Sequence, residues 1–493
     1  MIGRSGSLRR GRPLLTAALS SLLLSACWVG PTYKKPDIPP PARWKQASGD
    51  EARATSDENA AKTSSASLAP AAPDAAGVWP ATDWWQGFGS TQLDAYVTEA
   101  RHSNDDLLAA MARVREADAQ VRVAGGALLP GIDASGTASR SRALVSGEGP
   151  RMVNLFSPQL SASYALDFWG KNRATFASAR AAALASRFDQ QTVALTVVSS
   201  VASGYFQALE LRDRIAVARG NLANGQKILE GLKLQQVAGI ATGLDVAQQE
   251  TTVKLLEAAI PPLVQQLRQT VFALAVLLGK APESIDVDEG TLAQIKLPPI
   301  LEGMPSQLLA RRPDVAEAEQ NLIAANADIT VARAALFPNI ELTAGGGYES
   351  SQLQHLVQPY NRVYSVAANL TQPIFHAGAL HAQVSQSQAR YDELLSTYHK
   401  TVLTAFSNVE SALTATQQTA EQERRQQEAV EVAQRAYEFA RKQMSAGTVN
   451  ILTVLNTENA LFSAQDVLVQ VQYQRLQALV NLYVALGGGW RQG

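Results

Sequence analysis

The sequence predicts a mainly α-helical protein that also carries a membrane β-sheet, arranged as two internal repeats. The first observation is a set of landmarks that recur 208 positions apart. The second is a pair of segments in each copy that alternate apolar and polar side chains, as β-strands do. The third is a long stretch of helix-forming residues, free of Pro, after each pair. Each copy should therefore contain two strands, a very long helix, a turn and a second helix.

The N-terminus has the layout of a secretory signal over residues 1–26. A positively charged head precedes a short apolar stretch, Leu14–Leu24. Spanning a bilayer as a helix takes about 20 residues, so this stretch is too short to be a membrane anchor. We interpret residues 1–26 as a removable signal peptide.

Cys27 follows this stretch and is the only cysteine of the chain. Leu24–Cys27 resembles the bacterial lipobox, in which the Cys thiol receives lipid before cleavage. Cys27 is therefore the expected lipid attachment site, although an ordinary signal peptide with a stray Cys is the alternative. Trp28 replaces the Asp that retains such lipoproteins in the inner membrane, so the resemblance implies delivery to the outer membrane.

Residues 27–78 should form an acylated N-terminus and a flexible linker, because they contain few large apolar side chains. The folded body begins near Trp79. A tryptophan cluster at this point could be an interfacial belt or an aromatic plug that packs the start of the fold: Trp79, Trp84 and Trp85.

The internal repeat divides the body into 79–290 and 291–493. The paired landmarks are Pro130 and Pro338, Gly170 and Gly378, Gly239 and Gly447, Gly279 and Gly487, and Glu250 and Glu458. Five pairs at one offset are hard to obtain by chance, and the period is far too long for a solenoid.

Four segments alternate with period two, and their even-numbered positions are apolar, as at Leu166 and Leu370. Odd-numbered positions such as Ser163 and Asn369 are polar. A membrane β-barrel with a wet interior has this pattern, although a soluble antiparallel sheet would share it. The expected strands are about 131–141, 158–168, 339–349 and 362–373.

The long helices should reach lengths that no compact domain needs. Ala379–Ala446 contains neither Pro nor Gly, and such a helix is roughly 100 Å long. An elongated coiled-coil rod is the alternative reading of these segments. The expected helices are about 174–236, 244–278, 379–446 and 450–486.

Four strands per chain cannot close a barrel, and an open edge is not tolerated in lipid. The chain should therefore oligomerise in the bilayer. Two copies would supply eight strands and three copies twelve, and only the larger barrel leaves a useful channel. The predicted architecture is a homotrimer with a 12-stranded barrel, continued by a tube of long helices.

Composition excludes several other classes of protein. The chain is 46% hydrophobic and 18% charged with a net charge of −1, which argues against nucleic acid as a partner. No run of 18 apolar residues follows residue 27, so any membrane crossing should use strands. Gly345–Gly347 lacks the Lys of a phosphate loop. The histidines show no metal-site spacing: His102, His355, His376, His381 and His399. We expect no enzyme, metal or cofactor.

Several motifs after residue 78 match a known family. They are "DWWQGFGSTQLDAYVTEA", "RRPDVAEAEQNLIAANADITVARAALFPNI", "LDFWGKNRA", "TQPIFHAGA" and "ALGGGW". On these residues the chain resembles the outer membrane factors, the TolC and OprM type channels, and specifically their acylated NodT-like branch. The "RRPD" segment, Arg311–Asp314, is the most specific of these motifs.

The resemblance implies a trimeric outer-membrane β-barrel of a Gram-negative bacterium, continued by a periplasmic α-helical barrel that is closed at its far tip. Its implied partners are a periplasmic adaptor (membrane fusion) protein and an inner-membrane pump, of the resistance-nodulation-division or another type. The implied function is a passive duct of a tripartite efflux system that exports small toxic compounds or drugs. The alternatives are the channel of a type I protein secretion system and a lipid-anchored coiled-coil scaffold without a pore.

The helix turns "VAGIATGLDV" and "SAGTVNILTV" should form the closed tip. The resemblance implies adaptor contacts at both turns: Gly239, Gly243, Gly447 and Thr448. In the TolC-like pattern a Tyr, an Arg and two Asp form a polar lock, and here the matching residues are uncharged: Met444, Val449, Thr453 and Asn456. Asp245 is the remaining carboxylate, with either a helix N-terminal or a gating role. We expect a gate at Asp245, Thr453 and Asn456, closed by packing and hydrogen bonds.

Overall fold

The computed structural model describes residues 29–41, 44, 79–145, 149–287, 290–299 and 305–490. The expected signal peptide, Cys27 and most of the expected linker lie outside these described residues. The chain divides into two compact units, and each is described by itself. The first unit takes in the chain up to Asp37, residues 113–187 and residues 317–399, and the second unit takes in the remaining residues.

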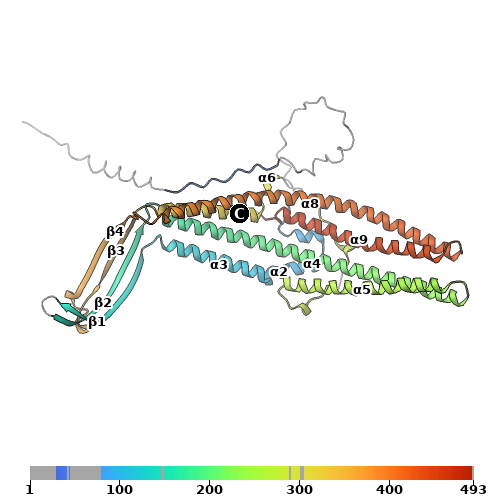
Figure 1. The fold of residues 1–493 in the computed structure, drawn as a ribbon, viewed down its shortest axis with the longest axis horizontal. Coiled ribbons are helices and arrows are strands. Elements are labelled where there is room, and N and C mark those ends of the chain that lie inside the picture. The colour runs from blue at the N-terminus through green and yellow to red at the C-terminus, as the bar shows by residue number, and fades with distance from the viewer. Residues whose placement is uncertain are drawn as a thin grey trace, which may run out of the picture. The chain divides into compact units, whose positions relative to one another are not determined.

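The first unit contains one antiparallel sheet in the order β1-β2-β3-β4 (Figure 1). Its strands are β1 (Gly131–Val145), β2 (Gly149–Leu166), β3 (Asn339–Tyr348) and β4 (Arg362–Thr371). The two hairpins share one register, because Gly131 pairs with Ser163 and Asn339 pairs with Thr371, each partner displaced by 208 positions.

The first hairpin is longer than the sequence indicates. β2 begins at Gly149, nine residues before the expected start, and β1 continues to Val145. Residues 149–157 do not alternate cleanly, so periodicity misses them. They form a strand because β1 pairs with them residue by residue from the turn onward. Backbone pairing across a hairpin therefore outweighs the weak local pattern.

The sheet connects to the ends of four helices, two of which continue into the second unit for most of their length. Strand β2 leads into α4 and strand β4 into α8, each of 67 residues and about 100 Å long. Their ends lie within three residues of the expected positions. The helices are α3 (Asp105–Gly126), α4 (Lys171–Val237), α7 (Pro313–Ala334) and α8 (Ala379–Ser445).

The N-terminal segment that begins at Val29 is attached to α7 within the first unit. The Lys35 ammonium lies 2.6 Å from a carboxylate oxygen of Glu319. The side-chain amide of Asn326 donates a hydrogen bond to the carbonyl of Pro31, at 3.1 Å. The segment from Val29 therefore follows a defined path along a helix of this unit.

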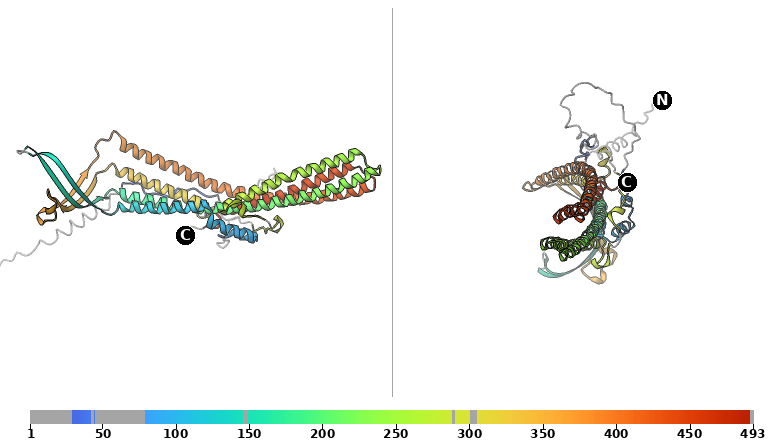
Figure 2. Two further views of the ribbon diagram at one scale, coloured as in Figure 1. Left: turned by 90° about the horizontal axis from the view of Figure 1, so that it is seen from below. Right: turned by 90° about the vertical axis from the view of Figure 1, so that its right-hand side faces the viewer.

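The second unit is helical, and its long helices form two hairpins of equal size. α4 lies beside α5 (Gly243–Leu277), and α8 lies beside α9 (Ile451–Ala485), as Figures 1 and 2 show. α5 and α9 have 35 residues each. The shorter elements are η3 (Trp84–Phe88), α2 (Thr91–Ser103), η4 (Pro282–Ser284), η5 (Leu292–Gln294) and α6 (Pro305–Leu308).

The repeat extends to single hydrogen bonds in this unit. The side-chain amide of Asn104 donates to the carbonyl of Leu277 at 2.9 Å. At positions 208 residues later, the Arg312 guanidinium donates to the carbonyl of Ala485 at 3.1 Å. Each bond ties the start of one helix to the end of another, so both copies use equivalent contacts.

Two repeat-related glycines allow the backbone to pass closely at these points. Gly279 and Gly487 both have positive φ angles, 65° and 85°. A Cβ atom at Gly487 would lie 1.9 Å from the carbonyl oxygen of Arg311, and one at Gly279 would lie 2.2 Å from that of Ser103. Only glycine fits without a backbone shift.

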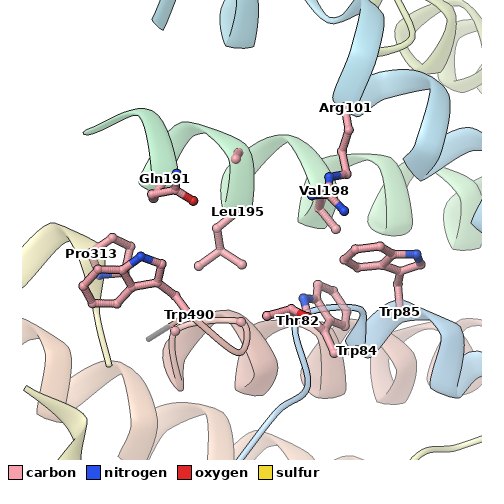
Figure 3. A pocket seen from close by; sticks show the side chains of 12 residues that line it. Thr82, Trp84, Trp85, Arg101, Gln191, Leu195, Val198, Pro313 and Trp490 are labelled. Atoms are coloured by element: carbon pink, nitrogen blue, oxygen red, sulfur yellow. The ribbon is translucent and has the colours of Figure 1, made fainter. Parts of the chain in front are cut away.

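The tryptophan cluster packs the start of the fold. Trp84 and Trp85 are buried, and Trp84 stacks on Tyr483 with ring centres 5.3 Å apart. Figure 3 shows both indoles, together with Leu195 and Val198 of α4, around a pocket of about 150 Å³. Trp79 lies under the guanidinium of Arg311. These contacts favour the aromatic plug over an interfacial belt.

One long helix, α4, meets the length and composition of a membrane span, with an 18-residue window of mean hydropathy 1.3. The absence of an uninterrupted run of 18 apolar residues after residue 27 predicts membrane crossing by strands only. In the second unit α4 buries Val201 and Phe206 completely, and Phe206 packs against Phe88. We interpret the apolar window as the face of a long helix that packs inside the protein.

Candidate functional site

One face of the sheet is apolar and exposed. Even-numbered residues pair with even-numbered residues on all strands, as where Leu166 opposes Ile340 and Ile340 opposes Leu370. The large apolar side chains of this face that are exposed are Ile132, Met152, Leu160, Leu342, Tyr364, Val366 and Leu370. An exposed apolar patch of this extent marks a surface that contacts protein or lipid.

The opposite face carries polar side chains that oppose one another across the strands. Ser163 lies opposite Thr343, and Glu341 lies opposite Asn369. Backbone pairing fixes this division, because a shift of one residue would exchange the two faces of a strand. The sheet is therefore suited to lipid on one side and water on the other.

The two helix turns of the second unit lie at the same end of that unit and share one geometry (Figure 1). Gly239 and Gly447 have φ angles of 74° and 73°. The amide after each glycine donates to a carbonyl five residues back, from Ile240 to Gln235 and from Thr448 to Gln443, both at 2.9 Å. This is the glycine-dependent helix ending that leaves the next residues free to start a new helix.

Asp245 belongs to a capping box at the start of α5. Its carboxylate accepts hydrogen bonds from the amide of Thr242 at 2.8 Å and from the Thr242 hydroxyl at 2.7 Å. The amide of Asp245 donates in return to that hydroxyl at 3.2 Å. These hydrogen bonds from Thr242 lower the pKa of Asp245. Its helix N-terminal role is thus observed.

Thr453 and Asn456 lie at the start of α9. The amide and hydroxyl of Thr453 both donate to the side-chain oxygen of Asn450, at 3.2 and 3.1 Å. Asn456 is exposed one turn later. The three expected gate residues thus lie in the first turns of α5 and α9, and no hydrogen bond joins Asp245 to either of the others.

A buried carboxylate lies just behind these turns, and sequence analysis treated it only as a repeat landmark. Glu458 is fully buried, and neither of its carboxylate oxygens has a hydrogen-bond partner. Burial raises the pKa of Glu458 to about 7, while nearby Gln249 and Arg441 oppose the shift. Its repeat partner Glu250 is exposed.

The signal that could have revealed this site is helical spacing. Glu458 continues the apolar stripe formed by Val454 and Leu461, three and four residues away. That stripe packs in a core cluster that also includes Val246 and Tyr437. Among the described residues, no three His, Cys, Asp or Glu side chains are grouped to hold a metal ion.

Known relatives have the same organisation. The pyoverdine export outer membrane protein OpmQ of Pseudomonas aeruginosa is 39% identical, over 97% of this chain and 98% of its own length. The cation efflux system protein CusC of Escherichia coli is 30% identical over 95% of this chain and 98% of its own length. A crystal structure of CusC matches 94% of this chain and all of that chain, with a TM-score of 0.80 and 29% identity.

The family model described as outer membrane efflux protein matches the chain twice, over residues 96–280 and 304–488. Both limits of the second match lie 208 residues after those of the first, which confirms the internal repeat. Together the matches cover most of the described residues. The chain therefore belongs to the outer membrane efflux protein family.

Proposed function

We propose that three copies of this chain form a passive duct, the outer-membrane channel of a tripartite efflux system. The observation that carries this proposal is a four-stranded sheet with one exposed apolar face, joined directly to helices of 67 residues. Four strands require further copies to close a barrel in lipid. Three copies give twelve strands and a polar interior through which solutes can pass.

The energy for transport comes from an inner-membrane pump, of the resistance-nodulation-division or another type, and an adaptor protein joins the pump to the duct. Support comes from the first helix turn, where Val237 and Ile240 are 90% and 76% exposed. Exposed apolar side chains at a turn suit a protein partner. The proposed adaptor contacts are at Gly239, Gly243, Gly447 and Thr448.

The cargo is a small toxic compound or drug that the pump selects. Relatives are named for pyoverdine export, for toluene efflux in Pseudomonas putida and for cation efflux. One fold therefore serves cargoes of different chemistry. A duct with small polar side chains such as Ser163 and Thr343 suits solutes of varied chemistry.

The gate consists of Asp245, Thr453 and Asn456, and it closes through packing and hydrogen bonds. Its support is the position of all three residues in the first turns of α5 and α9, beside the two glycine turns. Asp245 also holds the start of α5, so its charge is engaged locally by Thr242.

Planar-bilayer conductance of the purified full-length protein tests the duct. We expect discrete conductance steps, each from the insertion of one trimer. A protein that inserts without any conductance would favour the lipid-anchored scaffold without a pore. To separate efflux from type I protein secretion, a strain without the chain is compared with its parent. Efflux predicts greater sensitivity to small toxic compounds with an unchanged set of secreted proteins, whereas protein secretion predicts the reverse.

A further inference from the structure

Two buried polar side chains from different helix hairpins lie together behind the turns. Glu458 of α9 and Gln249 of α5 both have an exposed fraction of 0%. The side-chain amide of Gln249 is close enough to act on the Glu458 carboxylate. The apolar cluster at this level draws on all four long helices, through Leu232 of α4, Val246 of α5, Tyr437 of α8 and Val454 of α9. Glu458 and Gln249 therefore form a polar contact between two hairpins within a mainly apolar core.

The oxygen atoms of this contact outnumber the donors. Gln249 uses one N–H of its side chain to donate to the carbonyl of Gly225 in α4, at 2.9 Å. Its side-chain oxygen Oε1 and both carboxylate oxygens of Glu458 are buried and have no hydrogen-bond partner among the described residues. An ionised carboxylate only accepts hydrogen bonds, whereas a protonated one also donates. A proton on Glu458 therefore supplies the donor that these buried oxygens lack.

We propose that protonated Glu458 pairs with the side-chain amide of Gln249 and so clasps the two hairpins of one chain together, which keeps the tip closed until Glu458 loses its proton. The acid hydroxyl donates to Oε1 of Gln249, and the remaining side-chain N–H of Gln249 donates to the carbonyl oxygen of the acid. The bond from Gln249 to Gly225 is kept, so the pair links α9 to α5 and α4. This pair of side chains is called the clasp. It rests on the proposed duct and adds two residues to the proposed gate.

The groups that face Glu458 from the other helices do not neutralise its charge by contact. From α8, Arg441 and Tyr437 act on Glu458 electrostatically. Arg441 is exposed, its guanidinium lies 5.7 Å from the centre of the Tyr437 ring, and it makes no hydrogen bond to the carboxylate. From α5 and α4, the facing groups are the neutral Gln249 amide and the Gly225 carbonyl. Because burial raises the pKa of Glu458 to about 7, its proton leaves to solvent near neutral pH.

Loss of this proton should separate the two hairpins near the gate. The carboxylate then faces the Gln249 oxygen without a hydrogen between them, and a buried charge is stable only when water or a partner reaches it. Glu458 follows Thr453 by five residues in α9, and Gln249 follows Asp245 by four residues in α5. These spacings amount to little more than one helical turn, so a change at the clasp acts directly on the first turns of both helices.

The other half of the repeat does not contain the clasp. A shift of 208 positions relates Gln249 to Thr457 and Glu458 to Glu250. Glu250 is exposed, and the Thr457 hydroxyl donates to the carbonyl of Thr453 in its own helix, at 3.0 Å. Each chain therefore carries the clasp in one half of the repeat only, and Glu250 provides a matched carboxylate without burial.

Planar-bilayer recordings of the purified full-length protein at pH 5 and pH 8 test the clasp. Glu458→Gln retains the shape of the neutral acid and can pair with the Gln249 amide without a proton. Gln249→Met removes the amide and keeps a side chain of similar length. Glu250→Gln is the matched control, because it removes the same charge from an exposed position.

We expect the unmodified channel to be open at least five-fold longer at pH 8 than at pH 5, with a midpoint near pH 7. Glu458→Gln should stay closed at both pH values, Gln249→Met should open already at pH 5, and Glu250→Gln should behave as the unmodified protein. Titration of other groups, such as the histidines, would persist in Glu458→Gln. A pH dependence that survives this change, or that is absent from the unmodified channel, would overturn the clasp and leave the duct intact.

Hydrogen exchange of the same proteins separates failure of the clasp from failure of the duct. The clasp predicts that the amides of α5 near Gln249 lose protection together with those of α9 as pH rises from 5 to 8, after correction for intrinsic rates. Glu458→Gln should prevent both losses. Protein that shows this pattern without any conductance would overturn the duct and support the pairing of Glu458 with Gln249. A loss of protection confined to α9 would overturn the clasp.

Discussion

Glu458 shows how one residue can differ between two copies of the same unit. Its repeat partner Glu250 faces solvent, whereas Glu458, a residue of α9, faces α8 of its own hairpin and α5 of the other. Tyr437 and Arg441 of α8 and Gln249 of α5 surround it. A carboxyl in such a place favours its neutral form, because burial penalises the charge.

We expect the packing around Glu458 to become less stable as pH rises through about 7. The folded state holds the Glu458 proton up to about pH 7, whereas the unfolded chain releases it near 4.5. The contribution of neutral Glu458 to the free energy of unfolding is therefore fully present below about pH 4.5. It declines as pH rises to 7, by on the order of 3 kcal/mol. Glu458→Gln should abolish this decline.

Hydrogen exchange of the α9 amides near Glu458, corrected for intrinsic rates, measures the effect at pH 5 and pH 8. Glu250→Gln is the matched control and should leave the pH dependence of exchange unchanged. Equal protection at both pH values in the unmodified protein would contradict a neutral Glu458.

Arg312 should contribute more to the free energy of unfolding than any exposed arginine of the helices. It is buried, makes a two-bond contact to Asp314 at 2.6 and 2.9 Å, and caps the end of α9 through Ala485. Arg312→Ala should cost about 1–3 kcal/mol, because it leaves the carbonyl of the buried Ala485 without this partner and removes the ion pair to the half-buried Asp314. Arg424→Ala, in an exposed ion pair, should change the free energy of unfolding little. Thermal unfolding followed by circular dichroism compares the two variants, and equal losses would show that Arg312 is not a structural anchor.

At the scale of elements, the strands are the part of the fold that gives the clearest test. Leu160→Arg or Val366→Arg places a charge on the apolar face, in the middle part of its strand, and should cost roughly 2–4 kcal/mol near the bilayer midplane. Ser163→Arg or Asn369→Arg places it on the polar face and should be tolerated. Heat-resistant oligomer in outer-membrane fractions reports insertion, and conductance should change in the second set. Equal damage from both sets would mean that the two faces are wrongly assigned.

The turns provide a second test at this scale. Closure without a ring of charge on α9 predicts that conductance of the closed state depends weakly on ionic strength. Asn456→Asp adds three carboxylates to a trimeric pore and should raise its preference for cations, measured as a shift of reversal potential under a salt gradient. Asn456→Ser is the uncharged control. Strong cation selectivity in the unmodified channel that survives Asp245→Asn would refute this gate.

Sequence patterns located the helices well and the strands less well. Long helices were located within three residues because Gly239 and Gly447 end one helix of each pair by adopting positive φ, a property that sequence reveals. The start of β2 was missed because residues 149–157 owe their conformation to pairing with β1. Burial of Glu458 was missed because only tertiary packing distinguishes it from Glu250. Asp245 was identified as a helix-start residue, but its bonds to Thr242 required coordinates.

At the scale of the whole molecule, the lipid and the barrel are two separate attachments. Cys27→Ser should abolish lipid attachment, because no other thiol exists in the chain. A single lipid anchors modestly, so the barrel should still hold the trimer in the membrane. Labelled palmitate that still enters the Ser variant would refute Cys27 as the acceptor, and the unmodified protein provides the positive control.

The strand pairings also determine the shear of the barrel. The shear is the number of residues by which a path across the paired strands is displaced when it returns to its first strand. Gly131 pairs with Ser163, Ser163 with Thr343, and Thr343 with Ala367. If the pairing of β2 with β3 recurs between copies of the chain at positions shifted by 208 residues, Ala367 lies opposite Ser139 of the next copy. One passage across a chain therefore returns to β1 eight residues further along, and three chains give a shear of 24 for twelve strands.

This shear amounts to two residues per strand, twice that of an eight-stranded barrel with a shear of 8, whose strands are inclined by about 36°. The strands of this barrel must therefore be inclined more strongly to the barrel axis, and the diameter of the barrel increases accordingly. A more inclined strand needs more residues to cross the same thickness of lipid. Strands of 15 and 18 residues in the first hairpin exceed the 9–11 that suffice at about 45°. β3 and β4 have only ten residues each, so in a trimer the rim is uneven, with one long hairpin of β1 and β2 from each chain extending beyond the shorter strands.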